Sequence, residues 1–93
     1  MSDENTVSRT VTVGSSVGLH ARPAAAVVKA AGEQPAQVFL ETAEGKKAQA
    51  ASMLMVLALG AGHGDELTVT ASGDGAQESV DAMADLIASD LDA

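Results

Sequence analysis

Hydrophobic and polar residues alternate along several stretches of the chain, which is typical of strands that bury one face. In the first stretch, Val7, Arg9, Val11 and Val13 fall on one side, with serine and threonine between them. Threonines likewise separate the apolar residues Leu67, Val69 and Ala71. The pattern predicts four strands, at residues 7–13, 35–40, 48–49 and 67–71, with Pro35 opening the second and a hairpin turn at 44–46.

Two other stretches carry apolar residues at helical spacing, and a third, shorter one is continuously apolar. From Pro23, which suits a first helical turn, the spacing continues to Gly32, a good C-terminal stop. Ser52 is a natural N-cap for a short helix, and Asp74 with Gln77 resembles a capping box that has aspartate in place of serine or threonine. The last helix is expected to bury one stripe, formed by Val80, Met83, Ala84, Ile87 and Leu91.

The order of these elements is strand, helix, strand, strand, helix, strand, helix. Helices with one apolar face and strands that are half polar favour an α+β two-layer sandwich, with one face of the sheet packed and the other in water. At 93 residues the chain is long enough for one hydrophobic core. We therefore expect a single domain over residues 1–93, with residues 1–5 as a flexible tail.

The composition limits the kind of core and the kind of protein. Phe39 is the only aromatic residue, so the core has to be built largely from alanine, valine, leucine and methionine. The chain has no cysteine, which excludes disulfides and thiolate metal sites. The N-terminus does not resemble a signal peptide, and no apolar run approaches the length of a membrane span. These features predict a cytoplasmic protein without direct membrane insertion.

The formal net charge of −8 argues against nucleic acid as a partner, because the phosphates would be repelled. Solubility and adaptation to high salt both account for this acidity, and we favour solubility. His63 has no cysteine or second histidine nearby in the sequence, so we expect an exposed loop residue and no metal site. The acidic residues near the C-terminus are expected to form a solvated helix face and tail, made of Glu78, Asp81, Asp85, Asp90 and Asp92.

The segment Gly18–Ala24 places a histidine and an arginine at the start of the first predicted helix. His20 is expected at or next to the N-cap, where the free amides of Ala21 and Arg22 and the positive end of the helix dipole would point toward it. Helix N-termini bind phosphate, and an arginine adds a planar fork of donors. An imidazole beside such a pocket favours a group that accepts phosphoryl and passes it on. A solvated surface charge is the alternative for Arg22.

The same segment, Gly-Leu-His-Ala-Arg-Pro-Ala at 18–24, resembles the active-site signature of HPr, the histidine phosphocarrier family of the bacterial phosphoenolpyruvate:sugar phosphotransferase system. Residues 52–60 and 66–73 are similar to the family's second helix and last strand. The resemblance implies an open-faced sandwich, with an antiparallel sheet in the order 1-4-2-3 covered on one face by three helices. It implies phosphorylation of His20 at Nδ1, with enzyme I as donor and sugar-specific IIA domains as acceptors. No cofactor is expected, and the chain is expected to be a monomeric carrier rather than a turnover enzyme.

The resemblance also bears on regulation. The serine that matches Ser52 is phosphorylated by an ATP-dependent kinase in some members, to control catabolite repression. Here Ala51 stands where a basic residue commonly precedes that serine, and a helix cap is the alternative role for Ser52. An HPr kinase and a transcription regulator are therefore further candidate partners. Val17 departs from the family, in which a polar residue often stands three positions before the histidine.

The continuous apolar run after Ser52 exceeds what one buried helix face needs. A partner surface beside His20 and a fully buried short helix are both consistent with it. The leading interpretation is a sugar-uptake phosphocarrier. The alternatives are a carrier in a nitrogen-related or dihydroxyacetone-kinase relay, and a regulatory protein-binding module without relay chemistry. The expected docking residues are Leu19, Pro23, Met53, Leu54, Met55 and Leu57.

Overall fold

The computed structural model describes residues 6–89, so the predicted tail at 1–5 and the predicted positions of Asp90, Leu91 and Asp92 lie outside the described residues. The described chain forms four strands and three helices in the predicted order. Their bounds are β1 (Val7–Thr12), α1 (Ala21–Gly32), β2 (Val38–Thr42), β3 (Lys47–Gln49), α2 (Met53–Ala58), β4 (Glu66–Ala71) and α3 (Ala76–Ala88).

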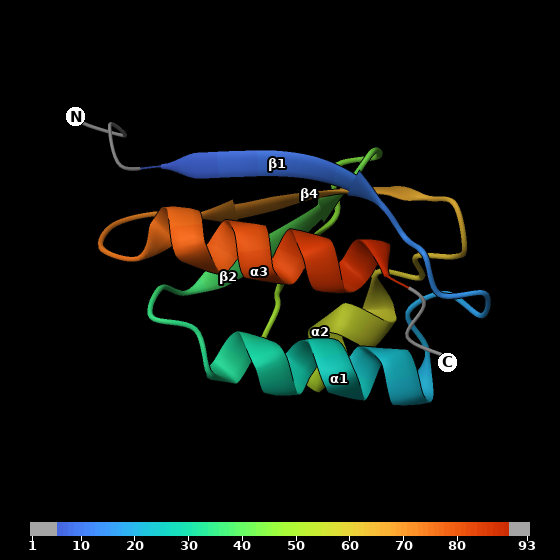
Figure 1. The fold of residues 1–93 in the computed structure, drawn as a ribbon. Coiled ribbons are helices and arrows are strands. Elements are labelled where there is room, and N and C mark those ends of the chain that lie inside the picture. Colours follow the sequence, from blue (N-terminus) through green and yellow to red (C-terminus); the bar gives the residue numbers. More distant parts are fainter. Residues whose placement is uncertain (1–5, 90–93) are drawn as a thin grey trace.

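The strands form one sheet in the order β1-β4-β2-β3, and every neighbouring pair is antiparallel. Val69 in the middle of β4 is paired with Arg9 of β1 on one side and Leu40 of β2 on the other. All three helices cover one face of the sheet: α3 packs against β1 and β4, while α1 packs against α2 and α3 (Figure 1). The predicted open-faced α+β sandwich is confirmed. The second strand begins at Val38, later than the expected opening at Pro35.

The core is built from aliphatic side chains, as the composition predicts. β4 contributes Leu67 and Val69, and α3 contributes Met83 and Ile87, all with 0% of their surface exposed. Phe39, the single aromatic residue, lies on β2 with 38% of its surface exposed and so does not belong to this core. Within residues 6–89, no helix has the length and apolar character needed to cross a lipid bilayer.

The uncovered face of the sheet carries hydroxyl groups that pair across β1 and β4. The side-chain oxygens of Ser8 and Thr70 are 3.1 Å apart, and those of Thr10 and Thr68 are also 3.1 Å apart. Such cross-strand pairs favour one register of the two strands. Because one face is polar and the other apolar, a slip by one residue would bury these hydroxyls, which the core could not satisfy.

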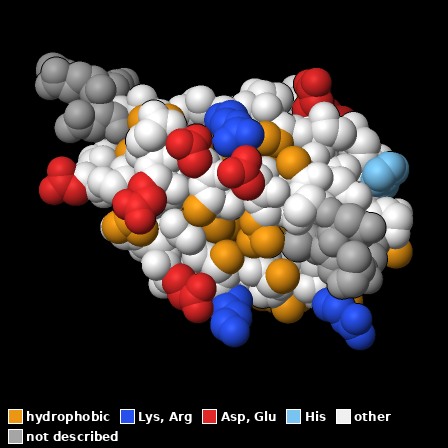
Figure 2. Space-filling view, viewed as in Figure 1, with side chains coloured by type: hydrophobic (Ala, Val, Ile, Leu, Met, Phe, Trp, Pro, Cys, Tyr) orange, Lys and Arg blue, Asp and Glu red, His pale blue; other side chains and the backbone are white. Residues whose placement is uncertain are grey.

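An ion-pair group ties the edge strand β1 to α3. Arg9 donates from Nη2 to Asp85 at 3.0 Å and from Nη1 to Asp81 at 3.4 Å. Figure 2 shows a basic side chain among acidic ones on the face where β1 and α3 lie in Figure 1. The side chains are about half exposed or more, so each pair contributes about 0–1 kcal/mol. Two of the acidic residues expected on a solvated face therefore also hold α3 to the sheet.

The start of α3 differs from the prediction. Its N-cap is Gly75, which has a left-handed backbone (φ 81°, ψ 7°), and the helix begins at Ala76, with no side-chain cap hydrogen bond. The expected capping box of Asp74 and Gln77 is therefore wrong. Gln77 instead donates from Nε2 to Asp81, 3.1 Å away on the next turn. Gly75 is the N-cap because the turn requires a positive φ at this position, which glycine adopts more readily than aspartate.

Candidate functional site

His20 is the N-cap of α1, as the sequence predicts. Its backbone is extended (φ −108°, ψ 163°), so the chain turns sharply into the helix immediately after it. The side chain makes no cap hydrogen bond, and the residue is exposed. The imidazole is therefore accessible to a partner molecule and is not consumed by holding the helix together.

The first turn of α1 leaves two amide groups available beside His20. Helices normally begin with four unpaired N–H groups. Here Ala24 donates its N–H to the His20 carbonyl at 3.1 Å, and Pro23 has no N–H to satisfy. Among the hydrogen bonds of residues 6–89, none is donated by the amide of Ala21 or Arg22. Unpaired amides at the positive end of a helix dipole have the chemistry of an anion cradle, and we use this name for the two amides below.

Arg22 adds a full positive charge to this cradle. The residue is exposed, and none of the ion pairs found within residues 6–89 involves it. Its guanidinium is therefore free to bind a phosphate in the bidentate geometry that arginine favours. Being unpaired does not by itself exclude the alternative of a solvated surface charge. The position in the first turn, beside His20, is what favours the phosphate role.

The backbone of Ala21, between these two residues, is strained. Its φ of +23° makes it the one non-glycine residue in the described part of the chain with a positive φ. A backbone in such a sparsely populated region costs about 1–3 kcal/mol and persists only where the surrounding structure enforces it. The strain coincides with the residue whose amide would meet an anion at His20.

Two residues expected on a docking surface are buried instead. Leu19 has 2% of its surface exposed, and Pro23 is also buried. The prediction that they contact partners is wrong, because a side chain packed in the core cannot make an interface. Leu19 instead anchors the chain just before His20. Its side chain packs in the core, and its N–H donates to the Ala61 carbonyl at 2.9 Å.

The burial of α2 distinguishes between the two interpretations of its apolar sequence, a partner surface and a fully buried short helix. Only Val56 is fully buried within it, whereas Leu54 is 79% exposed and Met55 and Leu57 are each 39% exposed. Met53 is half-buried against the core. α2 is therefore not a wholly buried helix. It presents an apolar surface, which we call the α2 patch and define as Leu54, Met55 and Leu57.

Ser52 caps α2. Its hydroxyl accepts a hydrogen bond from the Met55 N–H at 3.3 Å, so the predicted N-cap is confirmed. Val17, three residues before His20, is 56% exposed. A polar residue there could add a hydroxyl or amide contact to a bound phosphate, and valine cannot. The cradle at His20 therefore depends on the backbone amides and Arg22.

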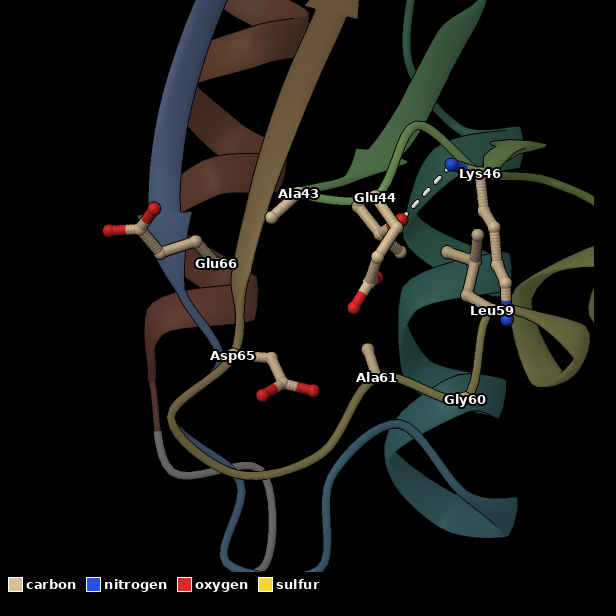
Figure 3. A pocket seen from close by; sticks show the side chains of 9 residues that line it. Ala43, Glu44, Lys46, Leu59, Gly60, Ala61, Asp65 and Glu66 are labelled. Atoms are coloured by element: carbon tan, nitrogen blue, oxygen red, sulfur yellow. Dashed lines mark hydrogen bonds between the residues drawn. The ribbon is translucent and has the colours of Figure 1, made fainter.

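A hollow with charged lining lies elsewhere, between the turn after β2 and the loop before β4. It encloses about 420 Å³ and is lined in part by Glu44, Lys46 and Asp65 (Figure 3). The Asp65 carboxylate accepts the Gly62 N–H at 2.8 Å, so it shapes its own loop. Within residues 6–89, no group of three or more His, Cys, Asp or Glu side chains is placed to hold a metal ion. His20 does not line this hollow.

Comparison with known proteins identifies the family. The sequence model of PTS-HPr, described as "PTS HPr component phosphorylation site", matches residues 7–89. The chain belongs to the HPr family.

Individual members of the family agree with this assignment. The phosphocarrier protein HPr of Streptomyces coelicolor is 42% identical over 84 residues, which cover 90% of each chain. HPr of Haloferax volcanii is 44% identical over 82 residues, or 87% of this chain and 92% of the relative. A crystal structure of HPr from Bacillus anthracis superimposes with a TM-score of 0.83 at 35% identity, over 88% of this chain and 96% of the other.

Family members with other names are also similar to this chain. The HPr-like protein Crh of Bacillus subtilis is 38% identical over 84% of this chain and 91% of its own length. The phosphocarrier protein NPr of Escherichia coli is 33% identical over 94% and 97% of the two chains. The resemblance noted from the residues around His20 is thus confirmed at the level of the family, and a phosphocarrier role follows. The circuit in which this member works does not follow from the family alone.

Proposed function

We propose that this HPr-family chain is a cytoplasmic carrier that takes a phosphoryl group onto His20 from phosphorylated enzyme I and gives it to sugar-specific IIA domains. The observation that carries the proposal is the exposed imidazole of His20 at the N-cap of α1, beside the available amides of Ala21 and Arg22. The description of the family by its phosphorylation site supports the proposal, because this arrangement has the chemistry to accept a phosphoryl group.

In this proposal the phosphoryl group passes from the imidazole of a donor histidine to the imidazole of His20. An unprotonated ring nitrogen of His20, by family analogy Nδ1, attacks the phosphorus on the donor histidine. A new N–P bond forms at His20, the N–P bond to the donor breaks, and the donor nitrogen keeps that electron pair. Catalysis of such a step is mainly positioning and charge stabilisation. The amides of Ala21 and Arg22 and the Arg22 guanidinium supply the stabilisation in this proposal, because they lie in the first turn of α1 directly after His20.

The α2 patch is the proposed docking surface for both partners. Leu54 is the most exposed large apolar residue among residues 6–89, and an exposed apolar cluster marks an interaction site more often than an isolated residue does. A carrier has to leave each partner quickly, so a small interface suits it. Methionine in the patch adapts to differently shaped partners because its side chain is unbranched and flexible.

The proposal is tested by intact-mass measurement after incubation with phosphoenolpyruvate and a catalytic amount of enzyme I. We expect one phosphoryl group per chain, lost in mild acid and absent from His20→Ala. His63→Ala is the matched control, because the chain has two histidines and this variant removes the other one. It should still reach one phosphoryl group at the end point. No adduct on the wild-type chain, while Streptomyces coelicolor HPr is phosphorylated in a parallel reaction, would refute the proposal.

The same phosphorylated chain distinguishes the alternatives. Transfer to a sugar-specific IIA domain supports the uptake circuit, and exclusive transfer to a nitrogen-related IIA domain or a dihydroxyacetone-kinase subunit supports a different one. The higher identity to HPr proteins than to NPr favours the first. Regulatory phosphorylation of Ser52 by an HPr kinase is a separate proposal, supported by the family match and by the half-buried, reachable position of this serine. ATP-dependent, acid-stable mass gain that Ser52→Ala abolishes would test it.

A further inference from the structure

The loop that delivers His20 to the start of α1 is bound by the loop between α2 and β4. Val13 donates its N–H to the Asp65 carbonyl at 2.9 Å and accepts from the Gly64 N–H at 3.0 Å. Leu19 donates to the Ala61 carbonyl at 2.9 Å. These bonds hold both ends of the β1–α1 loop, and Figure 3 shows the Gly60–Asp65 segment beside that connection. Between these two ends, Gly14 donates its N–H to the Ile87 carbonyl of α3 at 3.0 Å, and the middle of the loop makes a further contact.

His63 supplies a contact to that middle. Its Nδ1 lies 3.1 Å from the carbonyl oxygen of Ser15. The same oxygen accepts the Gly18 N–H at 3.1 Å, which closes a four-residue turn from Ser15 to Gly18. Gly18, with φ +74°, then directs the chain into Leu19 and His20. The imidazole of His63 therefore binds the carbonyl that closes the last turn before the site.

The contact fixes the proton on the His63 ring. A carbonyl oxygen only accepts hydrogen bonds, so an unprotonated Nδ1 would face it lone pair to lone pair. Nδ1 must therefore carry a proton when the ring is neutral, and it also carries one in the imidazolium form. The bond to Ser15 is available in both states. His63 thus binds the turn whether or not it is charged.

We propose that His63 is a positioning residue for phosphoryl transfer at His20. This inference rests on the proposed function, because it assigns His63 a part in the same reaction. By binding the Ser15 carbonyl, His63 keeps the Ser15–Gly18 turn closed and so keeps the His20 ring beside the amides that receive the phosphoryl oxygens. A transfer step is sensitive to displacements of about 1 Å, so loosening this turn slows it even when the fold is intact.

Two substitutions separate the nitrogen atoms of the ring. The Nδ2 amide of asparagine occupies the place of Nδ1, whereas the Nε2 amide of glutamine occupies the place of Nε2. We expect His63→Asn to keep the wild-type rate of transfer from phosphorylated enzyme I, and His63→Gln and His63→Ala to lower kcat about 3- to 10-fold. KM for the chain should not change, because His63 is outside the α2 patch. The loss should be equal at all pH values at which His20 is active.

The test combines rapid-quench transfer kinetics with two measurements that do not need phosphorylation. Nitrogen NMR of the wild-type chain with the His63 ring neutral should show the proton on Nδ1. Amide exchange at Leu19 should be faster in His63→Ala than in His63→Asn. A proton on Nε2, or equal kinetics of the asparagine, glutamine and alanine variants, would overturn the inference. If the wild-type chain accepts no phosphoryl at all, the proposed function fails, and the NMR and exchange data still decide whether His63 holds the turn.

Discussion

Gly18→Ala tests the central feature of the site, the close approach of the His20 loop to the loop before β4. Gly18 has φ +74°, and a Cβ added there would lie 2.6 Å from the Ala61 carbonyl oxygen and 2.8 Å from the Gly62 Cα. Both obstacles are backbone atoms, which cannot turn away as a flexible side chain would. The segment has to move, and the Leu19 to Ala61 hydrogen bond, 2.9 Å long, is the first interaction that it would break.

The expected cost follows from two contributions. The left-handed backbone disfavours alanine by about 1–2 kcal/mol, reduced by about 0.4–1 kcal/mol because alanine also restricts the unfolded chain. Loss of the Leu19 hydrogen bond adds about 1 kcal/mol, and displacement of packed backbone adds more. We expect the free energy of unfolding to fall by about 2–3 kcal/mol. For a domain of this size that lowers Tm by about 10–20 °C.

Substitutions at two other glycines serve as matched controls. Stability is measured by urea denaturation followed by far-UV circular dichroism, because the chain has no tryptophan or tyrosine to give a fluorescence signal. Gly64 has φ +85° and no atom within 4 Å of an added Cβ, so Gly64→Ala isolates the backbone term and should cost about 1 kcal/mol. Gly32, at the end of α1, has neither obstacle. Gly32→Ala should stabilise the protein by about 0.5–1 kcal/mol.

The comparison between Gly18→Ala and Gly64→Ala decides the argument. If both variants lose the same stability within error, the packing of Gly18 against the Ala61–Gly62 backbone has no energetic consequence, and the reasoning is refuted. The unfolding m-value should stay constant across the series, because none of these changes alters the surface that unfolding exposes.

Further predictions concern single residues, and their effects on stability can be checked by the same denaturation assay. Ser52→Ala should cost about 1 kcal/mol and Ser52→Gly only a few tenths, because glycine tolerates an uncapped N-cap better than alanine; equal losses would argue against the cap. Ala21→Gly should raise stability by about 0.5–1 kcal/mol, since relief of the positive φ outweighs the entropy of glycine, and a clear loss would show that Ala21 is not strained. Met83→Ala should lower the free energy of unfolding by about 2–5 kcal/mol, because Met83 is fully buried. Leu54→Ala should change it by less than about 0.5 kcal/mol and should raise KM in transfer from enzyme I. A large loss of stability from Leu54→Ala would show that Leu54 belongs to the core.

Local patterns in the sequence were sufficient wherever a structural feature is decided by neighbouring residues. The spacing of apolar residues gave α1 and α3, and the cap at Ser52 formed as predicted. His20 reached the N-cap because the residues that set it there, from Gly18 to Pro23, are contiguous. Local reasoning failed at α3, where Asp74 looked like a cap. It had no means of weighing the positive φ that the turn requires at Gly75.

Burial was harder to predict than secondary structure. Leu19 and Pro23 lie within three residues of the exposed His20, yet both are buried, because successive residues at the start of a helix point in different directions. The continuous apolar run of α2 did not reveal which side chains face water. That depends on how α2 sits against α1 and β3, which packing of the whole domain determines.

The sequence by itself determined the elements, the alternating core and the candidate histidine with its helix N-terminus, because each depends on the chemistry of a few adjacent residues. Only the tertiary structure decided how segments far apart in the chain meet. Arg9 pairs with Asp85, 76 positions away, and His63 reaches Ser15 across 48 positions. No local periodicity encodes such contacts, since they arise when the sheet and helices close around one core and bring their connecting loops together.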